Sequence, residues 1–200
     1  SILGTLQAGY TDFKFLSDTS KKIFDREALL GVSITGWMNN PDILFDEKIL
    51  QKGAKIVKDV NKQVAEIIGI NSAARTTCVK PSGNASVLLQ TASGIHAEHS
   101  NMYIRNVQMN KESEITQAIM KTNPYMVEDS VWSAGGTDVV VSFPILPKKG
   151  SMYKDDLLGV KHLELVKKAQ KHWVEAGTNE DLCADKGVRH NVSNTIIVDN

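Results

Sequence analysis

The sequence predicts an α/β fold, because candidate β-strands alternate along the chain with two long amphipathic helices. The first helix is expected from Asp46 to Ile68, where apolar residues recur at helical spacing and Gly69 follows as a C-cap. The second is expected from Leu157 to Ala176, with Gly177 closing it. No internal repeat or low-complexity segment interrupts this alternation, which favours strands linked through helices.

Shorter elements follow from residue type and from breakers. Asn110 is a plausible N-cap for a helix over 111–121 that would turn Ile115, Ala118 and Ile119 inward before Pro124. Runs rich in β-branched residues between glycines and prolines predict strands. The remaining expected elements are a helix over 20–30, strands over 31–36, 74–80, 102–109, 138–143 and 191–198, and a short helix ending at Thr91.

Size and charge limit the class of protein. The 200 residues are 42% hydrophobic, enough for one sizeable core, so we expect a single partial domain over residues 1–200. The 23 basic and 23 acidic residues leave no net charge that would favour nucleic acid or an anionic membrane. With no long apolar run and no signal-peptide pattern near the start, a cytoplasmic location is expected.

The two cysteines do not predict a disulfide framework or a zinc site, because Cys78 and Cys183 lie far apart and lack Cys-x-x-Cys spacing. Cys78 is expected to be buried and inert in its strand, and Cys183 exposed in a polar stretch. Trp37, Trp132 and Trp173 are expected to pack in the core. The chain opens without Met and closes directly after a strand-like run, so we expect an excerpt of a longer protein.

The stretch from Thr76 to Ser86 is the most informative part of the sequence. It combines a buried strand, a turn of Pro, Gly and small polar residues, and a helix start at Val87. Unpaired amides at a helix start stabilise an anion, so this turn predicts a phosphate site. The residues assigned to it are Pro81, Ser82, Gly83, Asn84, Ala85 and Ser86.

Local chemistry leaves alternatives open. Pro-Ser-Gly is also an ordinary turn followed by a Ser or Asn cap, and Lys80 points either to the ligand or to solvent. His96, Glu98 and His99 lack a third convincing metal ligand, so no metal site is predicted. His190 with Asn191 either orients the last strand or forms a hydrogen-bonded turn, and Arg105 pairs with a carboxylate or approaches a substrate.

Four ordered blocks carry a resemblance to a known family. They are 4–8, 30–36, 76–107 and 189–196, reading Gly-Thr-Leu-Gln-Ala, Leu-Gly-Val-Ser-Ile-Thr-Gly, the phosphate turn with its return, and Arg-His-Asn-Val-Ser-Asn-Thr-Ile. Together they closely resemble the catalytic barrel of ribonucleotide reductases, in particular the adenosylcobalamin-dependent (class II) ribonucleoside-triphosphate branch.

The resemblance implies a fold and a chemistry. This chain would supply the second, C-terminal half of a ten-stranded α/β barrel, with the upstream half of that barrel as its partner. It implies radical reduction of ribonucleotides, adenosylcobalamin as cofactor, and a dithiol reductant such as thioredoxin. The family's Pro-Ser-Gly-Thr-x-Ser loop holds the substrate phosphates, and here Asn84 stands where Thr is usual.

The family's catalytic groups are not among these residues. The Asn-Pro-Cys-Gly-Glu finger loop does not occur, and neither Cys78 nor Cys183 matches a catalytic position. We therefore expect this segment to be inactive alone, with no catalytic residue and no cobalamin site. Two alternatives are a noncatalytic nucleotide- or phosphate-binding module and a fragment of a class I large subunit. Gly83 argues against the latter, which normally has an acidic residue there.

Overall fold

The structure is a computed structural model that describes residues 1–198, and for Asn84 the backbone alone. It contains two compact units. The first is built from residues 1–98 and the residues from 148 onward, and the second from residues 99–147. A division into compact units does not decide whether they make one domain, so the single partial domain over residues 1–200 stays a prediction.

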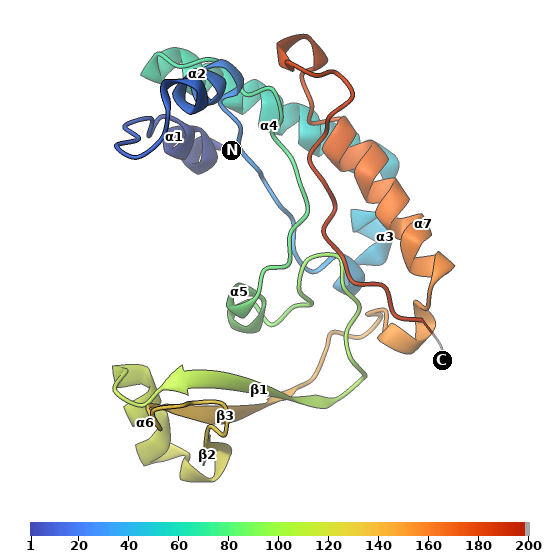
Figure 1. The fold of residues 1–200 in the computed structure, drawn as a ribbon. Coiled ribbons are helices and arrows are strands. Elements are labelled where there is room, and N and C mark those ends of the chain that lie inside the picture. Colours follow the sequence, from blue (N-terminus) through green and yellow to red (C-terminus); the bar gives the residue numbers. More distant parts are fainter. Residues whose placement is uncertain (199–200) are drawn as a thin grey trace. The chain divides into compact units, whose positions relative to one another are not determined.

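Helices and extended segments alternate in the first unit (Figure 1). Its α-helices are α1 (Ile2–Ala8), α2 (Asp18–Glu27), α3 (Pro41–Leu44), α4 (Glu47–Ile68), α5 (Asn84–Leu88) and α7 (Val160–Ala169). Short 3₁₀ turns lie at Trp37–Asn39, Lys154–Asp156 and Glu180–Leu182, and a π-helical stretch, Gln170–Glu175, continues α7.

Three extended segments run parallel at the centre of this unit. Val32 forms a parallel bridge with Thr77, and Val79 forms one with Val192, so the order is 28–34, then 74–80, then 190–194. α4 connects the first segment to the second, and α7 precedes the third. This is the α/β arrangement that the sequence predicts.

These segments are not the continuous strands expected over 31–36, 74–80 and 191–198. Their pairing is limited to isolated bridges, partly because main-chain groups bond elsewhere. The Thr76 amide donates to the Gly177 carbonyl at 3.0 Å, and the Thr77 hydroxyl donates to the Trp173 carbonyl at 2.6 Å. The helix end that follows α7 therefore occupies hydrogen bonds that a neighbouring strand would otherwise take.

The core lies between the segments and the helices α4 and α7. Trp173 is 4% exposed, and its indole nitrogen donates to the Cys78 carbonyl at 2.9 Å, so the π-helical stretch is fastened to the middle segment. The prediction of α4 is confirmed, with Asp46 as N-cap and Gly69 as C-cap. Its buried side belongs to Leu50, Ala54, Val57, Asn61 and Ala65, whereas the expected inward residues Ile49, Ile56 and Ile67 are exposed.

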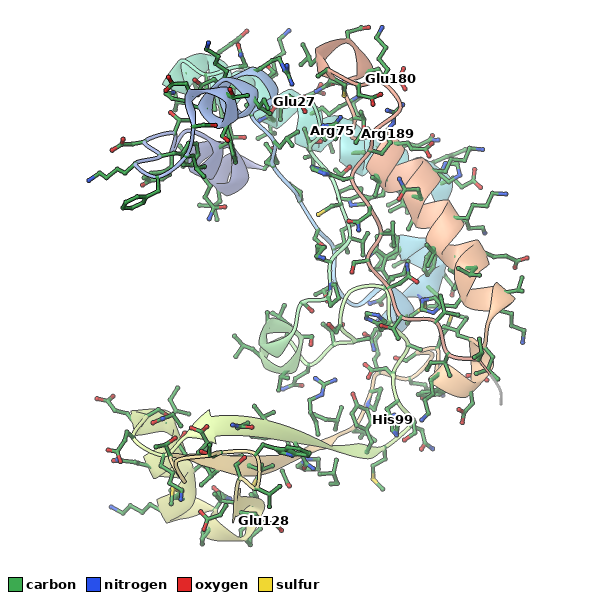
Figure 2. All side chains as sticks on the ribbon, in the orientation of Figure 1. Glu27, Arg75, His99, Glu128, Glu180 and Arg189 are labelled. Atoms are coloured by element: carbon green, nitrogen blue, oxygen red, sulfur yellow. The ribbon has the colours of Figure 1, made fainter. Side chains whose placement is uncertain are left out.

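A buried ion pair ties the amino ends of the segments together. Arg75 Nη1 donates to Glu27 Oε2 at 2.6 Å, and both side chains are under one tenth exposed (Figure 2). Arg75 Nε also donates to the Val188 carbonyl at 2.9 Å, which holds the chain before the third segment. An exposed counterpart, Arg189 with Glu180, lies on the loop that follows α7.

The second unit is a three-stranded antiparallel sheet of order β1-β3-β2. Its strands are β1 (Tyr103–Asn110), β2 (Val127–Asp129) and β3 (Asp138–Ile145), with α6 (Glu114–Thr122) and a 3₁₀ turn at Pro124–Met126. Val139 and Val141 of β3 are its buried centre, at 1% and 0% exposure. The strands predicted over 102–109 and 138–143 are confirmed within two residues.

Several expectations are corrected. α6 begins later than predicted because Ser113, not Asn110, accepts the capping bond from the Thr116 amide; Thr116 is buried while Ile115 and Ala118 are exposed. The predicted helix over 157–176 begins at Val160, after Gly159 at φ +50°. Trp132 is 84% exposed on the turn before β3, and Cys183 is buried at 8% under the Asn179 turn. Among the described residues, no helix is long and apolar enough to span a membrane.

Candidate functional site

The predicted phosphate turn lies where the parallel segments end. Thr35 follows the first segment, Pro81 follows the second, and Ser193 with Asn194 follows the third. His96 connects to the third of these ends, because its Nε2 accepts the Thr195 amide at 3.0 Å while its Nδ1 faces the Ser93 carbonyl at 2.9 Å. Loops at the carboxyl ends of parallel strands are where α/β proteins bind their ligands.

The turn itself depends on a glycine conformation. Gly83 has φ +52° and ψ −127°, and α5 begins at the next residue. A Cβ built on Gly83 would meet nothing within 4 Å, so the backbone angle rather than crowding requires glycine here. α5 has five residues, too few for a helix dipole to matter much, and the loop's own donors must carry any binding.

The six predicted residues do not all face outward. Pro81, Gly83 and Ala85 are exposed, and Ser82 is half-buried. Ser86 is 1% exposed and its hydroxyl donates to the Gly83 carbonyl at 2.6 Å, so it holds the turn together from inside. The side chain of Asn84 lies outside the described residues.

The amides of the turn are paired within the protein. Ser82 N and Gly83 N both donate to Ser93 Oγ, at 2.9 and 3.3 Å. Ala85 N donates to the Ser82 carbonyl at 3.1 Å, and Ser86 N to the Gly83 carbonyl at 3.2 Å. A ligand that uses the first two amides must therefore displace the Ser93 hydroxyl, which needs rotation about a single side-chain bond.

Sequence reasoning missed the residues that support the turn. Thr35 Oγ1 lies 2.7 Å from Ser82 Oγ, accepts the Gly94 amide at 2.9 Å and donates to the Ala92 carbonyl at 3.0 Å. Since the Thr35 proton goes to that carbonyl, Ser82 donates its own proton to Thr35 and keeps its lone pairs. Thr35 and Ser93 were visible in the sequence as polar residues beside glycines, but which turn they face is a tertiary fact.

Two glycines allow this close approach. A Cβ on Gly94, at φ +57°, would lie 2.8 Å from the Lys80 carbonyl oxygen. A Cβ on Gly36, at φ +75°, would lie 2.1 Å from Thr91 Oγ1. Both contacts are closer than real side chains permit, so the turn and its return at 91–94 pack together only with glycine at these positions.

Other candidate residues lie apart from the turn or serve the fold. Lys80 is exposed and its amide donates to Ser33 Oγ at 3.0 Å. His190 Nε2 lies 3.0 Å from the Leu30 carbonyl, linking the third segment to the first. In the second unit, Arg105 donates to the Tyr103 hydroxyl at 2.8 Å. No three His, Cys, Asp or Glu side chains in the described part of the chain gather as they would around a metal ion.

The cysteines remain free thiols, and Cys78 is half-buried rather than fully buried. Burial raises the pKa of the Cys78 thiol, although the charge of Lys80 opposes the rise. A thiol with a raised pKa is a poor nucleophile at neutral pH.

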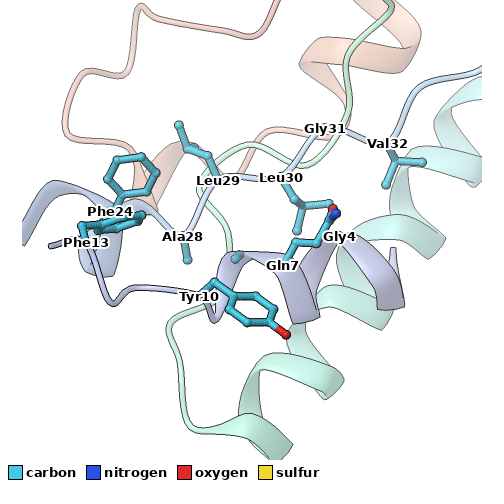
Figure 3. A pocket seen from close by; sticks show the side chains of 11 residues that line it. Gly4, Gln7, Tyr10, Phe13, Phe24, Ala28, Leu29, Leu30, Gly31 and Val32 are labelled. Atoms are coloured by element: carbon cyan, nitrogen blue, oxygen red, sulfur yellow. The ribbon is translucent and has the colours of Figure 1, made fainter. Parts of the chain in front are cut away.

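A pocket of about 530 Å³ opens at the amino half of the first segment (Figure 3). Tyr10, Phe13 and Phe24 surround it, with Gln7 from α1 and the main chain of residues 28–32. The Phe13 and Phe24 rings lie 4.7 Å apart. The sequence did not predict this pocket, which none of the six turn residues lines.

Known proteins resemble the chain in sequence. A probable adenosylcobalamin-dependent ribonucleoside-triphosphate reductase of Dictyostelium discoideum is 29% identical over 123 residues, which cover 62% of this chain and 16% of that protein. The adenosylcobalamin-dependent ribonucleoside-triphosphate reductase of Euglena gracilis is 25% identical over 159 residues, covering 78% of this chain and 22% of that protein. No protein-family model matches.

A solved structure shares the fold. The crystal structure of a B12-dependent (class II) ribonucleotide reductase superposes with a TM-score of 0.64 at 16% identity, covering 78% of this chain and 26% of that one. The chain thus spans about a fifth of the length of the relatives it matches in sequence. The resemblance carried by the four sequence blocks is confirmed: the chain is a relative of the adenosylcobalamin-dependent ribonucleoside-triphosphate reductases.

Proposed function

We propose that this chain is part of the catalytic barrel of a ribonucleotide reductase, and that residues 81–86 bind the phosphates of a ribonucleoside triphosphate. The observation that carries the proposal is the pair of sequence matches to ribonucleoside-triphosphate reductases. The fold shared with a class II enzyme supports the barrel. Reduction by a radical mechanism, with a dithiol such as thioredoxin as reductant, would belong to the whole protein, since the chain corresponds to a small part of its relatives.

The turn has the chemistry to hold phosphate without a dedicated cation. Ser82 and Ser93 offer hydroxyls, and the amides of Ser82 and Gly83 converge on one point, the Ser93 Oγ atom. Two amides that converge on one oxygen also have the geometry to converge on a phosphate oxygen. Because Ser93 takes that place here, we propose that its side chain turns aside when phosphate binds.

The relatives are named for adenosylcobalamin, and we propose that the whole protein uses this cofactor. The residues described here do not fit it. The pocket near Tyr10 has a volume of about 530 Å³, suited to a nucleoside-sized molecule and too small for a corrin. The larger groove of about 1400 Å³ between α4 and the loop after α7 is lined by charged side chains such as Lys58, Lys62 and Asp181. We assign no cofactor contact to this chain and expect it to be inactive alone.

Calorimetric titration with a ribonucleoside triphosphate, the matching nucleoside and inorganic triphosphate tests the turn. We expect the triphosphates to bind and the nucleoside to bind at least about tenfold more weakly, because phosphate contacts dominate. Gly83→Ala should abolish this preference, since Ala resists the angles that aim the amides.

Gly136→Ala is the matched control. Gly136 also has a positive φ, +63°, and open space around its missing Cβ, but it lies in the second unit. This variant should bind as the wild type does. Equal binding of triphosphate and nucleoside by the wild type, or unchanged binding by Gly83→Ala, would refute the assignment of the turn.

A further inference from the structure

Asn39 is a buried amide at the centre of the hydrogen bonds behind the turn. Its side chain is 6% exposed and makes four bonds. Nδ2 donates to Glu98 Oε1 at 2.8 Å and to Ser151 Oγ at 2.9 Å. Oδ1 accepts the Thr91 hydroxyl at 2.6 Å and the Ala92 amide at 2.7 Å. Two donations and two acceptances are the full capacity of an Asn side chain.

The orientation of this amide is fixed by its neighbours. The Ala92 main-chain N–H can only donate, so it must face the Asn39 oxygen. On the other side, the Glu98 carboxyl is 2% exposed and takes a proton from the nitrogen. Asp at this position would set a second carboxyl against Glu98, and an apolar side chain would leave both groups without this partner.

The two acceptances act directly on the strand that returns to the turn. Thr91 and Ala92 precede Ser93, whose hydroxyl receives the amides of Ser82 and Gly83. The Ala92 carbonyl in turn accepts Thr35 Oγ1, and Thr35 lies against Ser82. Asn39 is therefore one residue away from both groups that hold the turn in place.

We propose that Asn39 is a positioning residue: by fixing residues 91–92, it sets Ser93 and Thr35 in the places from which they shape the phosphate turn. It does not touch the ligand. The inference rests on the proposed function in what the turn binds. Its structural core, that Asn39 controls the conformation of residues 81–93, does not.

Asn39→Asp keeps the size of the side chain and removes its two donations. Asn61→Asp is the matched control, because Asn61 is 1% exposed and likewise bonds a hydroxyl, Thr5, and a main-chain amide, Ala73, at the other end of the segments. We expect Asn39→Asp to speed hydrogen exchange of the Ser82, Gly83 and Ala92 amides by about tenfold relative to Asn61→Asp. Affinity for inorganic triphosphate should fall by about tenfold as well, with Asn61→Asp unchanged.

A reversed pair separates positioning from general destabilisation. Combining Asn39→Asp with Glu98→Gln again places an amide against a carboxyl, so exchange of the Ala92 amide and triphosphate affinity should return toward wild type. Unchanged exchange in 81–93 for Asn39→Asp, or equal loss in Asn61→Asp, would overturn the inference. If the wild type binds no triphosphate while exchange responds as expected, the proposed function fails and the positioning role of Asn39 stands.

Discussion

The two ends of the parallel segments are held by opposite kinds of interaction. At the amino end a buried ion pair, Glu27 with Arg75, joins α2, the middle segment and the chain near Val188. At the carboxyl end, hydroxyls and amides of Thr35, Ser82 and Ser93 connect the turn to its return.

The difference separates a fixed end from an adjustable one. A buried charge has no substitute partner, because moving Glu27 from Arg75 would leave a charge without compensation. A hydroxyl such as that of Ser93 gives up two amides by rotating and finds another partner at small cost. We interpret the amino end as scaffold and the carboxyl end as the part suited to exchange internal hydrogen bonds for those of a ligand.

The largest expected effect breaks the scaffold end. Arg75→Met removes the main partner of buried Glu27 and should lower the free energy of unfolding by about 3–5 kcal/mol. Urea denaturation measures it. Arg189→Gln is the control, because its partner Glu180 is 61% exposed and such a pair contributes about 0–1 kcal/mol. Similar losses in both variants would contradict the distinction between the ends.

A smaller effect is expected where the turn meets its return. Gly94→Ala forces a Cβ to within 2.8 Å of the Lys80 carbonyl oxygen and adds strain at φ +57°. We expect a loss of about 1–3 kcal/mol together with weaker triphosphate binding. Gly69→Ala has similar strain, at φ +74°, but nothing within 4 Å, so it isolates the cost of the contact. Equal losses from the two substitutions would mean that the close approach is unimportant.

Acid titration should distinguish the ends by pH. His162 is 3% exposed, its Nε2 lies 3.0 Å from the Ile95 carbonyl, and burial lowers its pKa from the ordinary value of 6.5. Folding then favours the neutral ring, so this contribution is complete above pH 6.5 and declines as the pH falls below it, by up to about 1.4 kcal/mol per pH unit.

Glu27 responds at lower pH. Burial would raise its pKa, but hydrogen bonds and charges from Arg26 and Arg75 together lower it from 4.5. The stability gained from this carboxylate is therefore present above pH 4.5 and lost as the pH falls through the folded-state pKa. His162→Gln should flatten the urea stability profile between pH 7 and 5 and leave the steeper loss below 4.5. A profile unchanged by His162→Gln would remove His162 from this account.

Local pattern predicted some elements well and others poorly. α4 was predictable because twenty-two residues repeat the helical period between Asp46 and Gly69, whose capping roles depend on nearby atoms alone. The start of α6 was missed by three residues because Asn110 and Ser113 are both good caps, and contacts chose between them. Trp132 was assigned to the core by residue type, yet its turn turns it outward.

The sequence by itself determined the phosphate turn as a candidate, the two long helices and the resemblance to class II ribonucleotide reductases, since each is written in residues adjacent in the chain. The tertiary structure alone decided that Ser93 receives the turn's amides, that Asn39 stands behind it and that Arg75 neutralises Glu27. Those partners lie 10, 53 and 48 residues apart at the bonds that join them, and such distant pairs are selected by packing of the whole unit rather than by local preference.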